Sequence, residues 1–145
     1  MPKNPAYEFG HLWEYPLRSV CTISTHDMAT LRGWWEEDPA LTARYYNQVL
    51  GQWGEVPTTA PGWACEEIVR QHLQSPSLLC ILAFQDWLSM DEDLRYPDAN
   101  AERINVPANP RHYWRYRMHL TIEDLMKKKR FNEKLTSMID EAGRF

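Results

Sequence analysis

Two short apolar runs separate stretches of the chain whose apolar residues recur at helical spacing. The first run, Val20 to Ile23, is rich in β-branched residues, so residues 19–24 are expected to form a strand. The second run, Leu78 to Phe84, contains seven consecutive apolar residues and follows Ser75-Pro76-Ser77. A continuous apolar run of this length after a turn signal predicts a strand buried on both faces, as in a parallel sheet.

Helical patterns fill most of the chain between these two runs. Residues 29–35 are expected to be helical, and a second helix is marked by Asp38 as N-cap, Pro39 at its first position and Gly51 just after its end. Apolar residues at i, i+1, i+4, i+5, i+8 and i+9 predict a third helix over residues 63–74.

After the second run the sequence changes to a loop and then to helices again. Residues 113–119 are expected to form a short helix. Thr121 and Asp124 resemble a capping box that begins a helix reaching about Arg130. A last helix is expected over roughly 132–142, closed by Gly143.

The order strand, helices, strand, helices indicates the α/β class with mostly helical content. Polar residues follow both apolar runs, His26-Asp27 after the first and Gln85-Asp86 after the second. Parallel strands of an α/β barrel present functional groups at their C-terminal ends in this way. Two parallel strands do not form a sheet that is stable alone, and the 145 residues fit one domain or part of one about twice as long.

Charge and composition exclude several functions. Sixteen basic and 20 acidic residues give a net charge of −4, which argues against nucleic acid as a partner. No segment approaches the roughly 18 apolar residues of a membrane span, and no secretory signal is expected. The separated cysteines, Cys21, Cys65 and Cys80, fit reduced core residues and a cytoplasmic location.

The histidines show no metal-ligand spacing and no glycine-rich phosphate loop is present, so neither a metal nor a cofactor is expected. Seven Trp and seven Tyr are many for a chain of this length. Such aromatic residues suit either a large core or a carbohydrate surface, and composition does not choose between the two.

His26-Asp27 is the first candidate for chemistry. A carboxylate at a strand end can stabilise a positive transition state, and the adjacent imidazole can hydrogen-bond a substrate hydroxyl. The alternative is that Asp27 caps the following helix and His26 packs beside it. On the residues alone, that alternative is favoured.

A proline-rich loop supplies the second candidate. In Glu102 to Pro110, Arg103 and Asn105 can reach sugar hydroxyls or orient a carboxylate. The alternative is a structural loop anchored by an ion pair of Arg103. The aromatic block Tyr113-Trp114-Arg115-Tyr116 can form a sugar platform, but its i, i+3 spacing favours core packing.

Taken together, these motifs resemble those of a known family. The blocks S-T-H-D-M (24–28), L-R-G-W-W (31–35), Q-D-W-L (85–88) and E-R-I-N-V-P-A-N-P-x-x-Y-W-R-Y-R (102–117) occur in the same order in the amylomaltases, the 4-α-glucanotransferases of glycoside hydrolase family 77. The -H-D-M- form is similar to that of a longer subgroup, which includes plant enzymes.

The resemblance implies a (β/α)8 catalytic barrel and transfer of α-1,4-glucan segments between maltooligosaccharides by a retaining mechanism. Asp27 matches the family's transition-state-stabilising carboxylate, and His26 matches a histidine that contacts the sugar. Arg103 and Asn105 match an R-x-N-x-P motif at the barrel rim, for which substrate binding is expected.

The resemblance also implies how the chain is organised. Residues 1–18 would connect, residues 19–74 would hold strand seven with its helices, and residues 78–145 would hold strand eight, the rim loop and the C-terminal helices. The family's nucleophile and acid/base match nothing here and would precede Met1, so the chain is expected to be inactive alone.

Two other functions compete with the transferase fragment. One is a non-catalytic glucan-binding or assembly module, and the other is an unrelated helical interaction domain. The two strands predicted to lack neighbours also suggest a homo-oligomer formed through their exposed edges.

Overall fold

The computed structural model describes residues 6–144 of the chain. It is mostly helical, with one small parallel sheet, which confirms the expected α/β class in this coarse form. In chain order the elements are η1 (Leu12–Glu14), β1 (Val20–Cys21), α1 (Leu31–Glu37), α2 (Pro39–Gln48), α3 (Gly62–Leu73), β2 (Leu79–Cys80), α4 (Phe84–Leu88), η2 (Ala99–Glu102), α5 (Ile122–Lys127) and α6 (Lys129–Glu141). Residues 1–5 of the expected connecting segment 1–18 lie outside the described residues.

The two strands pair in parallel, with Val20 opposite Leu79 and Cys21 opposite Cys80. The position and direction of both strands therefore agree with the apolar runs. The predicted burial of the second run was wrong, because Leu78, Leu79 and Ile81 are each at least half exposed. Within the described residues β2 has only β1 as a neighbour, and the chain turns into α4 at Phe84.

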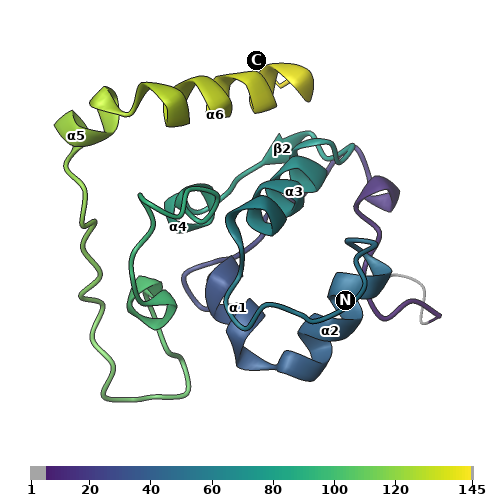
Figure 1. Ribbon diagram of the computed structural model, residues 1–145, viewed down its shortest axis with the longest axis horizontal. Coiled ribbons are helices and arrows are strands. Elements are labelled where there is room, and N and C mark those ends of the chain that lie inside the picture. The colour runs from purple at the N-terminus through teal and green to yellow at the C-terminus, as the bar shows by residue number, and fades with distance from the viewer. Residues whose placement is uncertain (1–5, 145) are drawn as a thin grey trace.

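The helices of the first half begin and end where capping chemistry predicts. Thr30 caps α1 by accepting a hydrogen bond from the Gly33 amide, and Asp38 caps α2 by accepting from the amides of Ala40 and Leu41. Figure 1 shows α1, α2 and α3 grouped together, with α4 beside α3 and with α5 and α6 along one edge of the molecule.

The core lies where α1, α3, α4 and α6 meet. Trp35 of α1, Val69 of α3 and Leu88 of α4 are almost wholly buried there, and Phe131 and Met138 of α6 complete it. Burial of such side chains contributes about 1.5–3 kcal/mol each. None of the helices among residues 6–144 is long and apolar enough to cross a bilayer.

The expected helix over residues 113–119 was wrong. This stretch is extended and belongs to a long segment that connects η2 to α5 along one side of the molecule (Figure 1). Its larger apolar residues, Trp114, Tyr116 and Met118, alternate with basic ones, and a period of two suits an extended chain better than a helix. Tyr113 and Trp114 are exposed, so the core-packing interpretation of the aromatic block was also wrong for these two rings.

The capping box at the start of α5 is confirmed in part. The Thr121 hydroxyl oxygen accepts from the Asp124 amide at 3.1 Å, and the hydroxyl donates to the Asp124 carboxylate at 2.8 Å. The helix predicted to reach Arg130 is shorter, since Lys128 leaves helical geometry with ψ 63° before α6 begins. Gly143, with φ 66°, follows the end of α6 as predicted.

Candidate functional site

Two segments far apart in the sequence meet at the candidate site. The Asn105 side-chain amide donates to Oδ1 of Asp27 at 2.7 Å across a separation of 78 positions. The other carboxylate oxygen, Oδ2, lies 3.3 Å from Nε2 of His26. The side chains of His26 and Asp27 are each 53% exposed, so the carboxylate remains open to a ligand. We call these three residues the His26–Asp27–Asn105 cluster.

The Arg103 side chain supports this cluster by binding the backbone of Asn105. Its Nε donates to the backbone carbonyl of Asn105 at 3.0 Å, which holds the residue that binds Asp27. The alternative of an Arg103 ion pair is not realised, because no carboxylate among residues 6–144 lies within 4.0 Å of it. The structure thus brings together all four residues singled out in the sequence.

The helix-cap interpretation of Asp27 was wrong. The N-cap of α1 is Thr30, and the Asp27 carboxylate instead faces His26 and Asn105. The backbone of Asp27 is held by a turn in which the Met28 amide donates to the Thr25 carbonyl at 3.1 Å. The Asp27 side chain therefore does not cap a helix and is available for chemistry.

Trp114 adds an aromatic ring to the site. Its ring centroid lies 5.1 Å from that of His26 at an angle of 44°, and the side chain is 58% exposed. In the sequence this ring is marked only as one member of an aromatic block, whose i, i+3 spacing favours core packing. An exposed indole beside a carboxylate can stack on the apolar face of a sugar ring.

The loop that carries His26 and Asp27 is closed at its base by a buried carboxylate. Asp86 of α4 is fully buried and accepts from the Ser24 hydroxyl at 2.5 Å and from the Leu31 amide at 2.9 Å. These donors stand at the two ends of the loop, so Asp86 sets its width. The expectation that Gln85 and Asp86 lie at a functional rim was wrong, since both are buried within α4.

A second buried carboxylate joins this loop to the segment of Asn105. Glu102 accepts from Arg32 Nη1 at 2.6 Å and from the Thr30 hydroxyl at 3.2 Å. The backbone carbonyl of Glu102 accepts from the side-chain amide of Gln85 at 3.2 Å. Because Glu102 immediately precedes Arg103, this network sets the position of the segment 103–105 relative to α1.

The two buried carboxyl groups are costly to ionise. Burial raises the pKa of Asp86, and hydrogen bonds from Ser24 and Leu31 offset part of that effect. Burial also raises the pKa of Glu102, and the Arg32 guanidinium opposes it. Among the described residues, Arg32 Nε is the one buried side-chain nitrogen or oxygen atom without a hydrogen-bond partner. All other buried polar side-chain atoms of this network are therefore hydrogen-bonded.

Neither the exposed cluster nor the buried network forms a metal site. Within residues 6–144, no three His, Cys, Asp or Glu side chains are grouped closely enough to hold a metal ion. The chemistry open to the cluster is that of an oriented carboxylate with an imidazole, an amide and an indole beside it. Such a set can bind hydroxyl groups and stabilise positive charge.

Comparison with known proteins agrees with these motifs. The family profile of glycoside hydrolase 77, described as 4-alpha-glucanotransferase, matches residues 1–121. The chain is 38% identical over 144 residues to the 4-alpha-glucanotransferase DPE2 of Oryza sativa subsp. japonica, covering 99% of this chain and 15% of that protein. It is 31% identical over 126 residues to the 4-alpha-glucanotransferase of Chlamydia trachomatis, covering 86% and 23%.

A second bacterial relative shows similar coverage. The 4-alpha-glucanotransferase of Aquifex aeolicus is 31% identical over 117 residues, which is 81% of this chain and 21% of that protein. The chain therefore spans about a quarter or less of the length of these curated relatives.

Proposed function

Because the chain belongs to glycoside hydrolase family 77, the 4-alpha-glucanotransferases, we propose that it forms part of a transferase catalytic domain and supplies the carboxylate Asp27 to its active site. The observation that carries this proposal is the hydrogen bond from Asn105 to Asp27. It joins two motifs that match the family at distant positions, and it leaves the carboxylate accessible.

The proposed reaction is transfer of an α-1,4-glucan segment between maltooligosaccharides with retention of configuration. Such a reaction passes through a transition state with positive charge on the sugar ring. The Asp27 carboxylate stabilises that charge, and the Asn105 amide holds one of its oxygens in place. His26 binds a sugar hydroxyl beside the scissile bond, and Arg103 positions Asn105.

The proposed architecture is the last two β/α units of a (β/α)8 barrel. Residues 19–74 would form the seventh strand with its helices, and residues 78–145 the eighth strand with the rim loop. The parallel pairing of β1 and β2, and the position of His26-Asp27 in the loop that follows β1, support this assignment. The nucleophile and acid/base of the family have no counterpart in the chain, so we expect the isolated 145 residues to be inactive.

A glucan-binding or assembly module is the second candidate. The exposed Trp114 beside His26 favours sugar binding without catalysis. The exposed apolar residues of β1 and β2 favour assembly, and a homo-oligomer through these strand edges stays a prediction. A cytoplasmic location also stays a prediction of the cysteine usage, and the three thiols are free.

The test is Asp27→Asn in a polypeptide that contains these 145 residues and an upstream barrel with the nucleophile and acid/base. We expect glucose release from maltotriose to lose about 100-fold or more in kcat, since a preorganised charge at the transition state contributes that much. Full activity of Asp27→Asn would refute the catalytic role and leave the binding module.

A further inference from the structure

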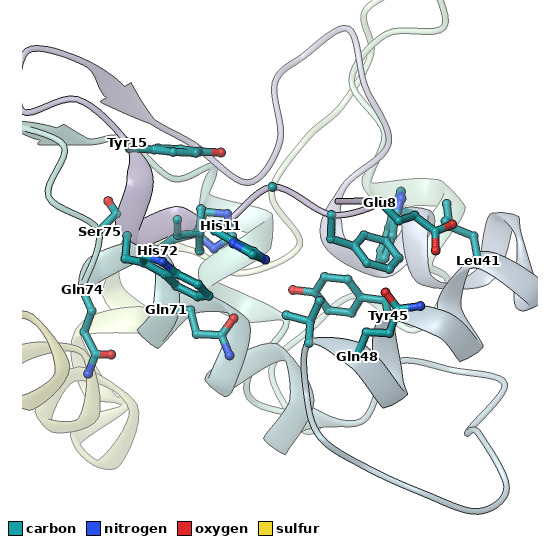
Figure 2. A pocket seen from close by; sticks show the side chains of 16 residues that line it. Glu8, His11, Tyr15, Leu41, Tyr45, Gln48, Gln71, His72, Gln74 and Ser75 are labelled. Atoms are coloured by element: carbon teal, nitrogen blue, oxygen red, sulfur yellow. The ribbon is translucent and has the colours of Figure 1, made fainter. Parts of the chain in front are cut away.

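A large cavity lies at the end of the sheet opposite the His26–Asp27–Asn105 cluster. It has a volume of about 970 Å³, is open to solvent on one side, and is lined mainly by the segment 8–15, by α2 and by the end of α3 (Figure 2). Because α3 leads into the start of β2, this cavity lies where the strands begin. The cluster follows the end of β1, so the two sites are separate.

Aromatic rings form much of the cavity wall. Tyr45 packs edge-on against both Phe9 and Trp34, with ring centroids 5.1 Å apart in each case. His11 stacks on Trp13 at 4.4 Å, and Trp13 itself is 70% exposed. Flat rings of this kind fit the apolar faces of sugar rings, while their polar edges remain hydrated.

The polar side chains of the wall are mainly neutral. Figure 2 shows Gln71 and Tyr45 facing the cavity from two sides. Gln71 uses one amide hydrogen on Glu67 at 3.0 Å and retains its carbonyl and second hydrogen. Gln48 makes no side-chain hydrogen bond to the described residues, so its amide is also available.

The near absence of charged side chains in the cavity wall indicates which class of ligand it can bind. No lysine or arginine lines the cavity among the described residues, and the one carboxylate that lines it, Glu8, is paired with Arg44 at 2.7 Å. Burial lowers the pKa of His72, which favours its neutral form. A neutral ligand with many hydroxyl groups fits this wall better than a phosphate or a cation.

We propose that this cavity is a second, non-catalytic binding site for a segment of α-1,4-glucan. A volume near the upper end of the usual range of about 300–1,000 Å³ has room for more than one sugar ring. The identity of the ligand rests on the proposed function, whereas the neutral polyhydroxyl class rests on the cavity wall alone. Such a site would hold one part of a long glucan away from the reacting end.

The test is calorimetric titration of the 145-residue chain with maltotriose. Trp13→Ala and Gln71→Ala each remove one cavity contact, and Trp53→Ala is the control because Trp53 is highly exposed and outside the cavity. We expect saturable binding that weakens about fivefold or more in the two cavity variants, as the loss of about 1 kcal/mol requires. Trp53→Ala should bind as the original chain does.

Three outcomes would overturn the inference. They are no binding at millimolar maltotriose, unchanged binding in both folded cavity variants, or binding of the apolar dye anilinonaphthalene sulfonate that maltotriose does not displace. The last result would identify the cavity as an apolar surface for protein contact. Failure of the proposed function is distinguishable, because Asp27→Asn tests kcat and leaves the cavity wall unaltered.

Discussion

Asn105 Nδ2 lies 2.7 Å from Asp27 Oδ1, although 78 positions separate the two residues. Asp27 is exposed and Asn105 is half-buried, and the hydrogen bond between them is open to solvent, so it contributes little to folding. What it does is limit the rotation of an exposed carboxylate. The buried carboxylates Asp86 and Glu102 hold the two segments beneath it, and a catalytic group needs this kind of support to keep its geometry.

Asn105→Ala should therefore impair catalysis more than stability. In an assembled transferase we expect kcat to fall by about 10- to 100-fold with little change in KM, since misplacement of a catalytic group can cost about 100-fold. Urea unfolding should show a change in the free energy of unfolding below about 0.5 kcal/mol. Steady-state kinetics with maltotriose measures the first effect.

Asn100→Ala is the matched control, because Asn100 is an exposed asparagine of η2 outside the cluster. It should leave both kcat and stability unchanged. If Asn105→Ala lost as little kcat as Asn100→Ala, the hydrogen bond to Asp27 would have no role in catalysis.

Asp86→Ala should destabilise the fold. It leaves the Leu31 amide and the Ser24 hydroxyl buried without their acceptor, and each such group costs about 1–3 kcal/mol. We expect the free energy of unfolding to fall by about 2–4 kcal/mol in urea. Asp86→Asn retains an acceptor oxygen for the Leu31 amide, so its free energy of unfolding should fall much less. Equal losses in both variants would contradict the role of these two hydrogen bonds in stability.

The Arg32–Glu102 pair should behave as a buried unit. Its atoms are 2.6 Å apart and both side chains are almost fully buried. Glu102→Gln leaves the Arg32 charge without its counter-ion, which costs about 3–5 kcal/mol. Adding Arg32→Met to this variant should recover part of the loss, because it removes the unpaired charge. A double variant that is less stable than Glu102→Gln would argue against this electrostatic account.

The sequence predicted best what depends on local chemistry. Asp38 and Pro39 begin α2 as expected, and Gly143 follows α6 with a positive φ. The four site residues were found because their motifs match the family, whereas His26-Asp27 alone favoured a helix cap. The polar residues after the second apolar run, Gln85 and Asp86, were expected at a functional rim, but both are buried in α4, where Asp86 holds the loop of the site residues from below.

Features that depend on distant contacts could not be predicted in this way. The apolar run from Leu78 matches a fully buried strand, and only the arrangement of neighbours decides its exposure. Cys21 and Cys80 are 59 positions apart and share no sequence motif, yet they are partners in the sheet register. No local pattern pairs Arg32 with Glu102, since their contact follows from how η2 packs against α1.

Stability should depend on pH through Asp86 with a defined sign. Burial raises the pKa of this carboxyl, so between its ordinary value of 3.8 and the raised value the folded chain binds more protons than the unfolded chain. The contribution of Asp86 is therefore most favourable below about pH 4 and is lost as the pH rises through the folded pKa. Exposed carboxyl groups with lowered pKa values act in the opposite direction, but they are common to every variant.

The difference between the original chain and Asp86→Asn isolates this effect, because asparagine does not titrate. We expect the free energy of unfolding of the original chain, relative to Asp86→Asn, to decrease as the pH rises above about 4 and to level off once the pH has passed the folded pKa of Asp86. Urea unfolding at several pH values measures it. A relative stability that rises over this range would mean that hydrogen bonds from Ser24 and Leu31 outweigh burial, and the pKa of Asp86 would then lie below its ordinary value.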